Sequence, residues 1–296
     1  MFLPNFTCQD QVFITGNHKL KTMFHKHNIL SGCFFTCCIV VAISGCSHNA
    51  YTSTNRSYKK QANAFAKELM KQPPRTDSTP APSYWVGTTN FGMRKPNFVV
   101  IHHTAQNACD STLRTFTLPR TQVSAHYVIC KDGTIHHMLN DYLRAWHAGI
   151  GKWGNVTDVN SISIGIELDN NGFEAFAPEQ IRSLLQLLKQ LKKNYSIPAA
   201  NFIGHLDIAP SRKVDPSKYF PWQMLSEHGF GNWYDTTNIR VPENFNVIQS
   251  LRVIGYDIKD SVSAVKAFKL HFLQQDASSV ITEEDKRIIY ALSKKY

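Results

Sequence analysis

The sequence predicts a mixed α/β fold, with a mixed central β-sheet flanked by helices and a small C-terminal unit of three helices. A continuous apolar run of strand length occurs at 97–102, which is typical of a buried strand, and SISIGIEL at 161–168 predicts a further strand. Other segments repeat apolar residues every three to four positions, which is typical of helices packed on one face. With 296 residues, 43% of them hydrophobic, the chain is long enough for a sizeable core.

The N-terminus is expected to be an export signal. From Met23 a short basic start precedes an apolar run over 29–43 and then small residues, the three-part layout of a secretory signal. The run is too short to argue for a stable membrane-spanning helix. Translation from Met1 would make the signal unusually long, so Met23 is the expected start.

The end of this signal, Ile43-Ser44-Gly45-Cys46, is similar to a bacterial lipobox. The similarity implies that Cys46 is acylated and begins the mature chain, and a nearby cut without lipid is the alternative. Ser47, rather than Asp, resembles the sorting signal of Gram-negative outer-membrane lipoproteins. We therefore expect a lipid-anchored outer-membrane protein that faces the periplasm.

The net charge bears on the binding partners that we expect, and the cysteine count bears on the redox compartment. The formal net charge is +10, but no block of five Lys or Arg occurs, so we do not expect a nucleic-acid-binding protein. Beyond Cys46 only Cys109 and Cys130 remain, an even pair that suits an oxidising compartment. A disulfide between them is left open, because sequence does not supply the geometry.

The domains follow in order along the chain. Residues 47–95 are polar and contain PPRTDSTPAP, so they predict a tether with a short helix near 60–71. The main globular domain is expected over 96–235. The helical unit is expected over 240–296, with helices at about 244–254, 262–274 and 282–294.

Within the main globular domain, strands are predicted at 97–102, 124–130, 134–139, 161–168 and 201–204. Lys131-Asp132-Gly133 predicts a hairpin turn between the second and third. A helix is predicted from Pro178 to Asn194, because apolar residues recur at helical spacing after a proline suited to the first turn. Its apolar positions are Ile181, Leu184, Leu185, Leu188 and Leu191.

Seven histidines lie between positions 102 and 205. A catalytic zinc site needs three N or O ligands and an open position for water. His102 and His205 are expected at strand ends, and Asp215 follows in a loop that Pro210 interrupts and Pro216 closes. Spacing alone leaves ordinary structural roles open for all three.

Five motifs then resemble the zinc-dependent N-acetylmuramoyl-L-alanine amidases, the family that shares its fold with peptidoglycan recognition proteins. They occur in order over 100–216 and read VIHHTA, SAHYVI, AWHAGI, ISIGIEL and HLDIAPSRKVDP, and the resemblance as a whole covers roughly 95–296. The resemblance implies one zinc ion bound by His102, His205 and Asp215. It also implies that Glu167 is the catalytic acid/base and that Lys213 stabilises the oxyanion.

Other polar residues have weaker support. Asp169 is the rival base, and only the resemblance separates it from Glu167. His126, Trp146 and His147 are candidate substrate contacts, each with a structural role as the alternative. His103 is expected to point to the opposite sheet face. Surface or packing roles are expected for His136 and His137, and Asp207 is expected to organise the loop backbone.

The resemblance implies hydrolysis of the amide between N-acetylmuramic acid, or its 1,6-anhydro form, and L-alanine. The substrates would be peptidoglycan or muropeptides, in cell-wall turnover or recycling, and we expect a monomer. The alternatives are a non-catalytic peptidoglycan-binding module on the same fold and a cytoplasmic amidase. The C-terminal unit resembles peptidoglycan-binding helical domains but departs from their pattern at 275–283, so a positioning role is its alternative.

Overall fold

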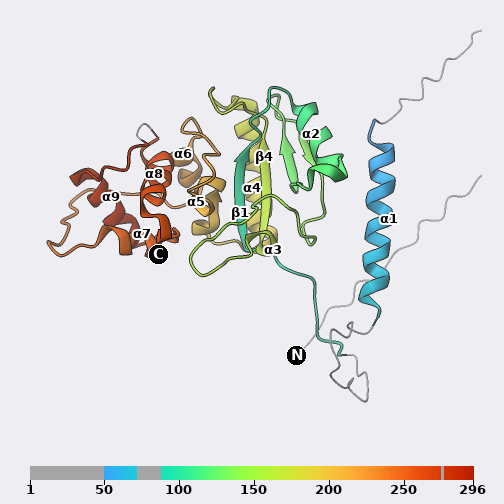
Figure 1. Cartoon of the computed structure of the whole chain (residues 1–296), viewed down its shortest axis with the longest axis horizontal. Helices are drawn as coiled ribbons and strands as arrows, with labels where there is room; N and C mark the ends of the chain where they lie inside the picture. The colour runs from blue at the N-terminus through green and yellow to red at the C-terminus, as the bar shows by residue number, and fades with distance from the viewer. Residues whose placement is uncertain (1–49, 72–87, 275–276) are drawn as a thin grey trace, which may run out of the picture. The chain divides into compact units, whose positions relative to one another are not determined.

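The computed structural model describes residues 50–71, 88–274 and 277–296 (Figure 1). The signal, the start at Met23 and the lipobox at Cys46 lie outside the described residues. Helix α1 (Thr52–Leu69) is described by itself; it starts earlier than the helix expected near 60–71. No helix among the described residues is long and apolar enough to cross a membrane.

A five-stranded mixed sheet forms the centre of the domain that follows (Figure 1). The strand order is β3-β2-β4-β1-β5. β1 is parallel to β4 and β5, β2 is parallel to β4, and β3 is antiparallel to β2. The predicted mixed sheet is therefore confirmed. The strands are β1 (Phe98–His103), β2 (Tyr127–Ile129), β3 (Ile135–His137), β4 (Ser163–Leu168) and β5 (Phe202–Gly204).

The hairpin between β2 and β3 forms at the predicted turn. Gly133 has φ +86°, a left-handed conformation that glycine adopts without strain. The Asp132 carboxylate accepts from the Thr134 N–H at 2.9 Å. β2 is shorter than expected, because the N–H of Ser124 bonds to the Trp146 carbonyl in a neighbouring loop instead of to a strand.

The helix predicted from Pro178 is α4 (Pro178–Tyr195), and it buries the expected apolar stripe apart from the partly buried Leu185. The three C-terminal helices are present near their predicted bounds. They are α7 (Val247–Ile254), α8 (Ser261–Phe272) and α9 (Glu283–Ser293). The other α-helices of the described domain are short: α2 (Cys109–Thr117), α3 (Val159–Ile162), α5 (His205–Ile208) and α6 (Trp222–Glu227).

Alternate residues of β1 serve two hydrophobic cores. Val99 and Ile101 pack in one cluster with α4, whereas Phe98 and Val100 pack in the other with α5 and the C-terminal helices. Because side chains alternate along a strand, His102 lies on the α5 side of the sheet. The alternation of side chains along β1 thus decides on which face of the sheet His102 lies.

The C-terminal helices also contact α5 through polar groups. Asp207 is fully buried and accepts from the Tyr256 hydroxyl at 2.7 Å and from the backbone N–H of Gly204 at 2.7 Å. His271 of α8 places Nδ1 2.8 Å from the same carboxylate. Asp207 therefore binds the backbone at the start of its own loop, as expected, and also ties that loop to the C-terminal helical unit. The domain boundaries themselves stay a prediction.

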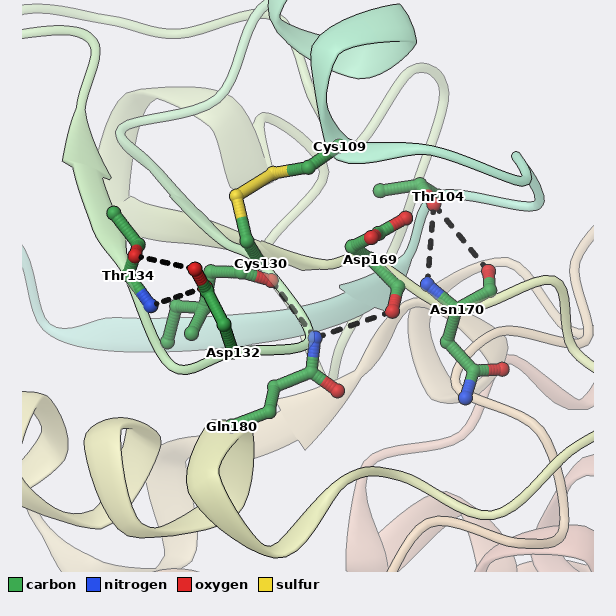
Figure 2. Close-up of a disulfide and its surroundings, with 9 residues drawn as sticks. Thr104, Cys109, Cys130, Asp132, Thr134, Asp169, Asn170 and Gln180 are labelled. Atoms are coloured by element: carbon green, nitrogen blue, oxygen red, sulfur yellow. Dashed lines mark hydrogen bonds between the residues drawn. A yellow bond between two sulfur atoms is a disulfide. The ribbon is translucent and has the colours of Figure 1, made fainter.

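A disulfide joins Cys109 at the start of α2 to Cys130 at the end of β2 (Figure 2). The sequence had left this bond open. It closes a loop with a sequence separation of 21 residues, and such a cross-link restricts the unfolded chain.

We predict that replacing both cysteines by serine lowers the free energy of unfolding by about 3 kcal/mol, by the loop-entropy relation. Urea denaturation of the wild type and of the double variant, each with and without reductant, measures this. Reductant should destabilise only the wild type. Equal midpoints for all four samples would contradict the prediction.

Candidate metal centre

Three candidate ligands from separate parts of the chain meet beside β1. His102 belongs to β1, and His205 opens α5 directly after β5. Asp215 reaches the same point from the loop after α5, where its carbonyl accepts from the Leu206 N–H at 2.7 Å. His102 Nδ1 lies 2.9 Å from His205 Nδ1 and 3.2 Å from Asp215 Oδ2. His205 Nδ1 lies 3.0 Å from Asp215 Oδ2.

The tautomer of His102 follows from the hydrogen bonds behind it. The Ser163 hydroxyl donates its one hydrogen to the Val159 carbonyl at 2.6 Å, so it accepts from Nε2–H of His147 at 3.0 Å. Nδ1 of His147 therefore carries no hydrogen and accepts from Nε2–H of His102 at 3.1 Å. This assignment leaves Nδ1 of His102 with a lone pair that faces the other two candidate ligands.

His205 is held in the same tautomer by Ala148, the residue that follows His147. Its Nε2 lies 3.3 Å from the carbonyl oxygen of Ala148. A carbonyl can only accept, so Nε2 carries the hydrogen and Nδ1 does not. The buried Asn160 side chain accepts from the N–H groups of His147 and Ala148 at 3.0 and 2.9 Å. Residues 147–148 thus orient both imidazoles, as outer partners of metal ligands do.

These three acceptor atoms repel one another, and a divalent cation bound between them would remove this repulsion. Two lone pairs and a carboxylate oxygen, 2.9–3.2 Å apart, repel unless positive charge lies between them. Tetrahedral zinc with bonds of about 2.0–2.1 Å needs ligand atoms about 3.3 Å apart. Burial and the neighbouring His205 imidazole lower the pKa of His102 to about 4, so its ring is neutral at pH 7, as metal binding requires.

In the described part of the chain one other group of metal-binding residue types converges. It consists of Cys109, Cys130 and His136, but its two sulfur atoms are bonded to each other. Metal binding by this group would therefore need a reduced protein.

Glu167 lies directly beside the three ligand atoms. It is opposite His102 in the register of β1 and β4, and its Oε1 is 4.0 Å from His102 Nδ1. Its Oε2 is buried, with no hydrogen-bond partner among the described residues. Burial, followed by the negative charge of Asp215, raises the pKa of Glu167 to about 8, and a bound cation would oppose this rise. Such an unpartnered oxygen can exchange a proton with a nearby water.

A cleft of about 420 Å³ opens over these groups. Lys213 and Asp215 both line it, but so does Val214 between them, so the lining does not show the alternation expected of an extended stretch. Trp146 also lines it, and 51% of this residue is exposed, so its indole is available to a ligand. Further lining residues are Thr104, Gln106, Phe116, Ser124 and Arg212.

The structure places two of the expected substrate contacts differently. His126 is fully buried and does not line the cleft, which favours the structural role; its Nδ1 accepts from the Gly165 N–H at 3.0 Å. His147 lines the cleft, and both of its ring nitrogens are engaged, by His102 and Ser163. These contacts orient His102, and a contact of His147 with substrate stays a prediction.

The structure also places the other residues considered from the sequence. Asp169 lies near the disulfide, with its carbonyl 3.2 Å from Gln180 Nε2 (Figure 2), and it does not line the cleft. His103, expected to point to the opposite sheet face from His102, lines the same cleft, and its Nδ1 accepts from the Ser217 N–H at 3.1 Å. His137 stacks on Tyr127 with ring centroids 4.5 Å apart, a packing role as expected.

Sequence reasoning missed Asn160 and Ser163. Neither lies in a run of metal-binding residue types, and their partners are 12 to 16 positions away in the chain. The tertiary structure alone brings them behind the imidazoles. Two motifs were usable signals: AWHAGI contains the segment that they hold, and ISIGIEL contains Ser163 itself.

We predict that Ser163→Ala weakens zinc binding by about 10–100-fold, the usual cost of losing such an outer partner. Without the hydroxyl, Nε2–H of His147 loses its acceptor, so His147 is no longer held in the tautomer that accepts from Nε2–H of His102. The Nδ1 lone pair of His102 is then no longer fixed toward the metal. Competition with a chromogenic chelator measures the affinity. Ser161→Ala is the matched control, because its hydroxyl donates to Asp158 and accepts from Arg144 and contacts neither imidazole. Equal affinities for the two variants would contradict the assignment.

The comparisons with known proteins agree with this arrangement. A family profile described as N-acetylmuramoyl-L-alanine amidase matches residues 92–218. The chain is 34% identical over 230 residues to N-acetylmuramoyl-L-alanine amidase AmiD of Escherichia coli, which covers 67% of this chain and 82% of that protein.

Two solved structures are also similar. One is E. coli AmiD in complex with the substrate anhydro-N-acetylmuramic acid-L-Ala-D-γ-Glu-L-Lys, with a TM-score of 0.62 and 31% identity over 71% of this chain and 93% of that one. The other is AmpDh3 of Pseudomonas aeruginosa, with a TM-score of 0.63 and 30% identity over 74% of this chain and 98% of that one.

Proposed function

The chain belongs to the N-acetylmuramoyl-L-alanine amidase family, and on that premise we propose that it is a zinc-dependent hydrolase of muropeptides. The bond cleaved would join the lactyl carbonyl of N-acetylmuramic acid, or of its 1,6-anhydro form, to L-alanine. One observation carries the proposal: two imidazole nitrogens and a carboxylate oxygen converge within hydrogen-bond distance beside the unpartnered Oε2 of Glu167.

His102, His205 and Asp215 would hold one zinc ion. When bound, zinc polarises a carbonyl and lowers the pKa of water toward about 7. Glu167 would accept a proton from the attacking water and deliver it to the nitrogen of L-alanine as the C–N bond breaks. The products are the muramic carboxylate and a peptide with a free amino group.

Lys213 and Trp146 would act on the substrate. The ammonium of Lys213, on the rim of the same cleft, supplies positive charge to the oxygen that becomes negative in the transition state. The half-exposed indole of Trp146 offers a flat apolar surface for the sugar or the peptide. Residues 147–148 exclude alternative tautomers of the two imidazoles and so keep their Nδ1 atoms available.

Either form of muramic acid is included in the proposal, because the substrate in the similar AmiD complex contains the anhydro sugar. Incubation with defined muropeptides of both kinds, followed by mass spectrometry, tests the reaction. The expected products are a free L-alanyl peptide and a muramic acid lacking its stem. If wild-type protein binds these substrates but releases no peptide, the proposed hydrolysis is wrong and the non-catalytic alternative stands.

We propose further that the protein is anchored through lipid on Cys46 to the outer membrane and faces the periplasm. The lipobox-like sequence before Cys46 supports this. Incorporation of labelled palmitate should occur in the wild type and not in Cys46→Ala. Labelling of both, or of neither, would contradict it. The monomeric state and the lack of nucleic-acid binding stay predictions.

A further inference from the structure

Helix α1 carries an apolar stripe along one side. Tyr58, Ala62, Phe65 and Leu69 follow one another at steps of four, three and four residues, so they lie on one face. Phe65 is 55% exposed and Leu69 is 83% exposed, and α1 buries none of its residues. Large apolar side chains aligned in this way are not needed in a solvated tether.

The other side of α1 is basic. The helix contains four basic residues and one acidic residue, Glu68, which gives a formal charge of +3. At 100° per residue, the basic positions centre on the side opposite the stripe, with one of them at its border. They are Arg56, Lys59, Lys60 and Lys67.

We propose that α1 lies along the surface of a membrane that contains anionic phospholipid. The aromatic and aliphatic stripe would enter the headgroup region, and the basic side chains would contact lipid phosphates. A basic face opposite a Phe/Leu/Tyr stripe is the pattern of interfacial helices. Four basic side chains within 18 residues oppose a transmembrane orientation.

The chemistry favours lipid over an acidic protein surface. An acidic protein would complement the basic face but would leave Phe65 and Leu69 in water. An anionic bilayer satisfies both faces of α1 together. Only residues 47–51 separate α1 from Cys46, so acylation there would hold α1 at the bilayer. The proposal does not require that acylation, because the helix itself supplies both contacts.

A fluorescent probe on α1 tests this in the full chain. An environment-sensitive fluorescent amino acid is incorporated at position 65, on the stripe, or at position 60, on the basic face. Each protein is mixed with vesicles of phosphatidylcholine alone or with phosphatidylglycerol added. We expect a blue shift at position 65 that grows with the anionic lipid, and little change at position 60. Because the probe reports on α1 itself, attachment of the N-terminus by other means does not produce this pattern.

Charge reversal gives a second measurement. Lys60→Glu with Lys67→Glu should weaken insertion of position 65 by at least about 25-fold, since each basic side chain lost near an anionic surface costs about fivefold, and each introduced carboxylate adds repulsion. Lys189→Glu with Lys193→Glu, on the exposed side of α4, changes the net charge equally and should leave the shift unchanged.

Three results would overturn the proposal. Emission at position 65 could be the same in water and in both kinds of vesicle, which would make α1 a solvated tether. The α4 reversal could weaken insertion as much as the α1 reversal, which would indicate an effect of net charge. A shift that required purified cell-wall sacculi and was absent with anionic vesicles would identify the wall as the partner. Amidase activity in solution enters none of these readouts.

Discussion

Glu167→Gln is expected to reduce kcat for L-alanyl peptide release by roughly 10²–10⁴-fold, the usual contribution of a positioned acid/base. The amide keeps the size of the side chain but cannot accept a proton from water. In the wild type, Oε1 of Glu167 lies 4.0 Å from Nδ1 of His102, and its Oε2 is buried. Zinc content should stay at the wild-type value, because Glu167 is not one of the three converging ligands.

Asp169→Asn is the matched control, since Asp169 is the other carboxylate at the end of β4. It does not line the cleft, so its amide variant should keep kcat within a few-fold of the wild type. Initial rates at saturating muropeptide, with zinc determined on the same samples, decide between the two residues. A large loss in Asp169→Asn with little loss in Glu167→Gln would reverse their assignment.

Asp215→Ala is expected to abolish measurable hydrolysis by removing a zinc ligand. The loss of zinc affinity should exceed the roughly 10–100-fold that an outer partner costs. The backbone bond from the Leu206 N–H to the carbonyl of residue 215 does not depend on the side chain, so the loop should keep its path. Chelator competition on the folded variant measures the affinity, and circular dichroism checks the fold.

Asp207→Asn provides the contrast within the same loop. Asp207 is buried and bonded to Tyr256 and His271, away from the ligand atoms. We expect this variant to lose stability while it still binds one zinc ion in the folded state. If Asp207→Asn lost zinc and Asp215→Ala retained it, the third ligand would be wrong.

The periodic elements could be predicted from sequence because their signal is local. The run at 97–102 is continuous since both faces of β1 are covered, and the α4 stripe repeats at the helical period. The strands at 124–130 and 134–139 came out shorter in the structure. Their ends are decided by loop partners such as Trp146, which no local pattern reveals.

The candidate site was predictable only in part for the same reason. His102, His205 and Asp215 could be chosen because the resemblance supplied the pairing of distant positions. The strand register then separates Glu167 from Asp169, which local sequence could not do. Asn160 and Ser163 carry no chemical signature of their own, since their role depends on tertiary contacts with residues 147–148.

The central claim is that one zinc ion at His102, His205 and Asp215 is required for hydrolysis. The most direct measurement strips the wild-type protein with a chelator, adds zinc back in steps, and follows bound zinc and peptide release together. We predict that stripped protein is inactive, and that activity returns in proportion to zinc up to one ion per chain. Full turnover by zinc-free protein, or the same titration curve with Asp215→Ala, would contradict the account.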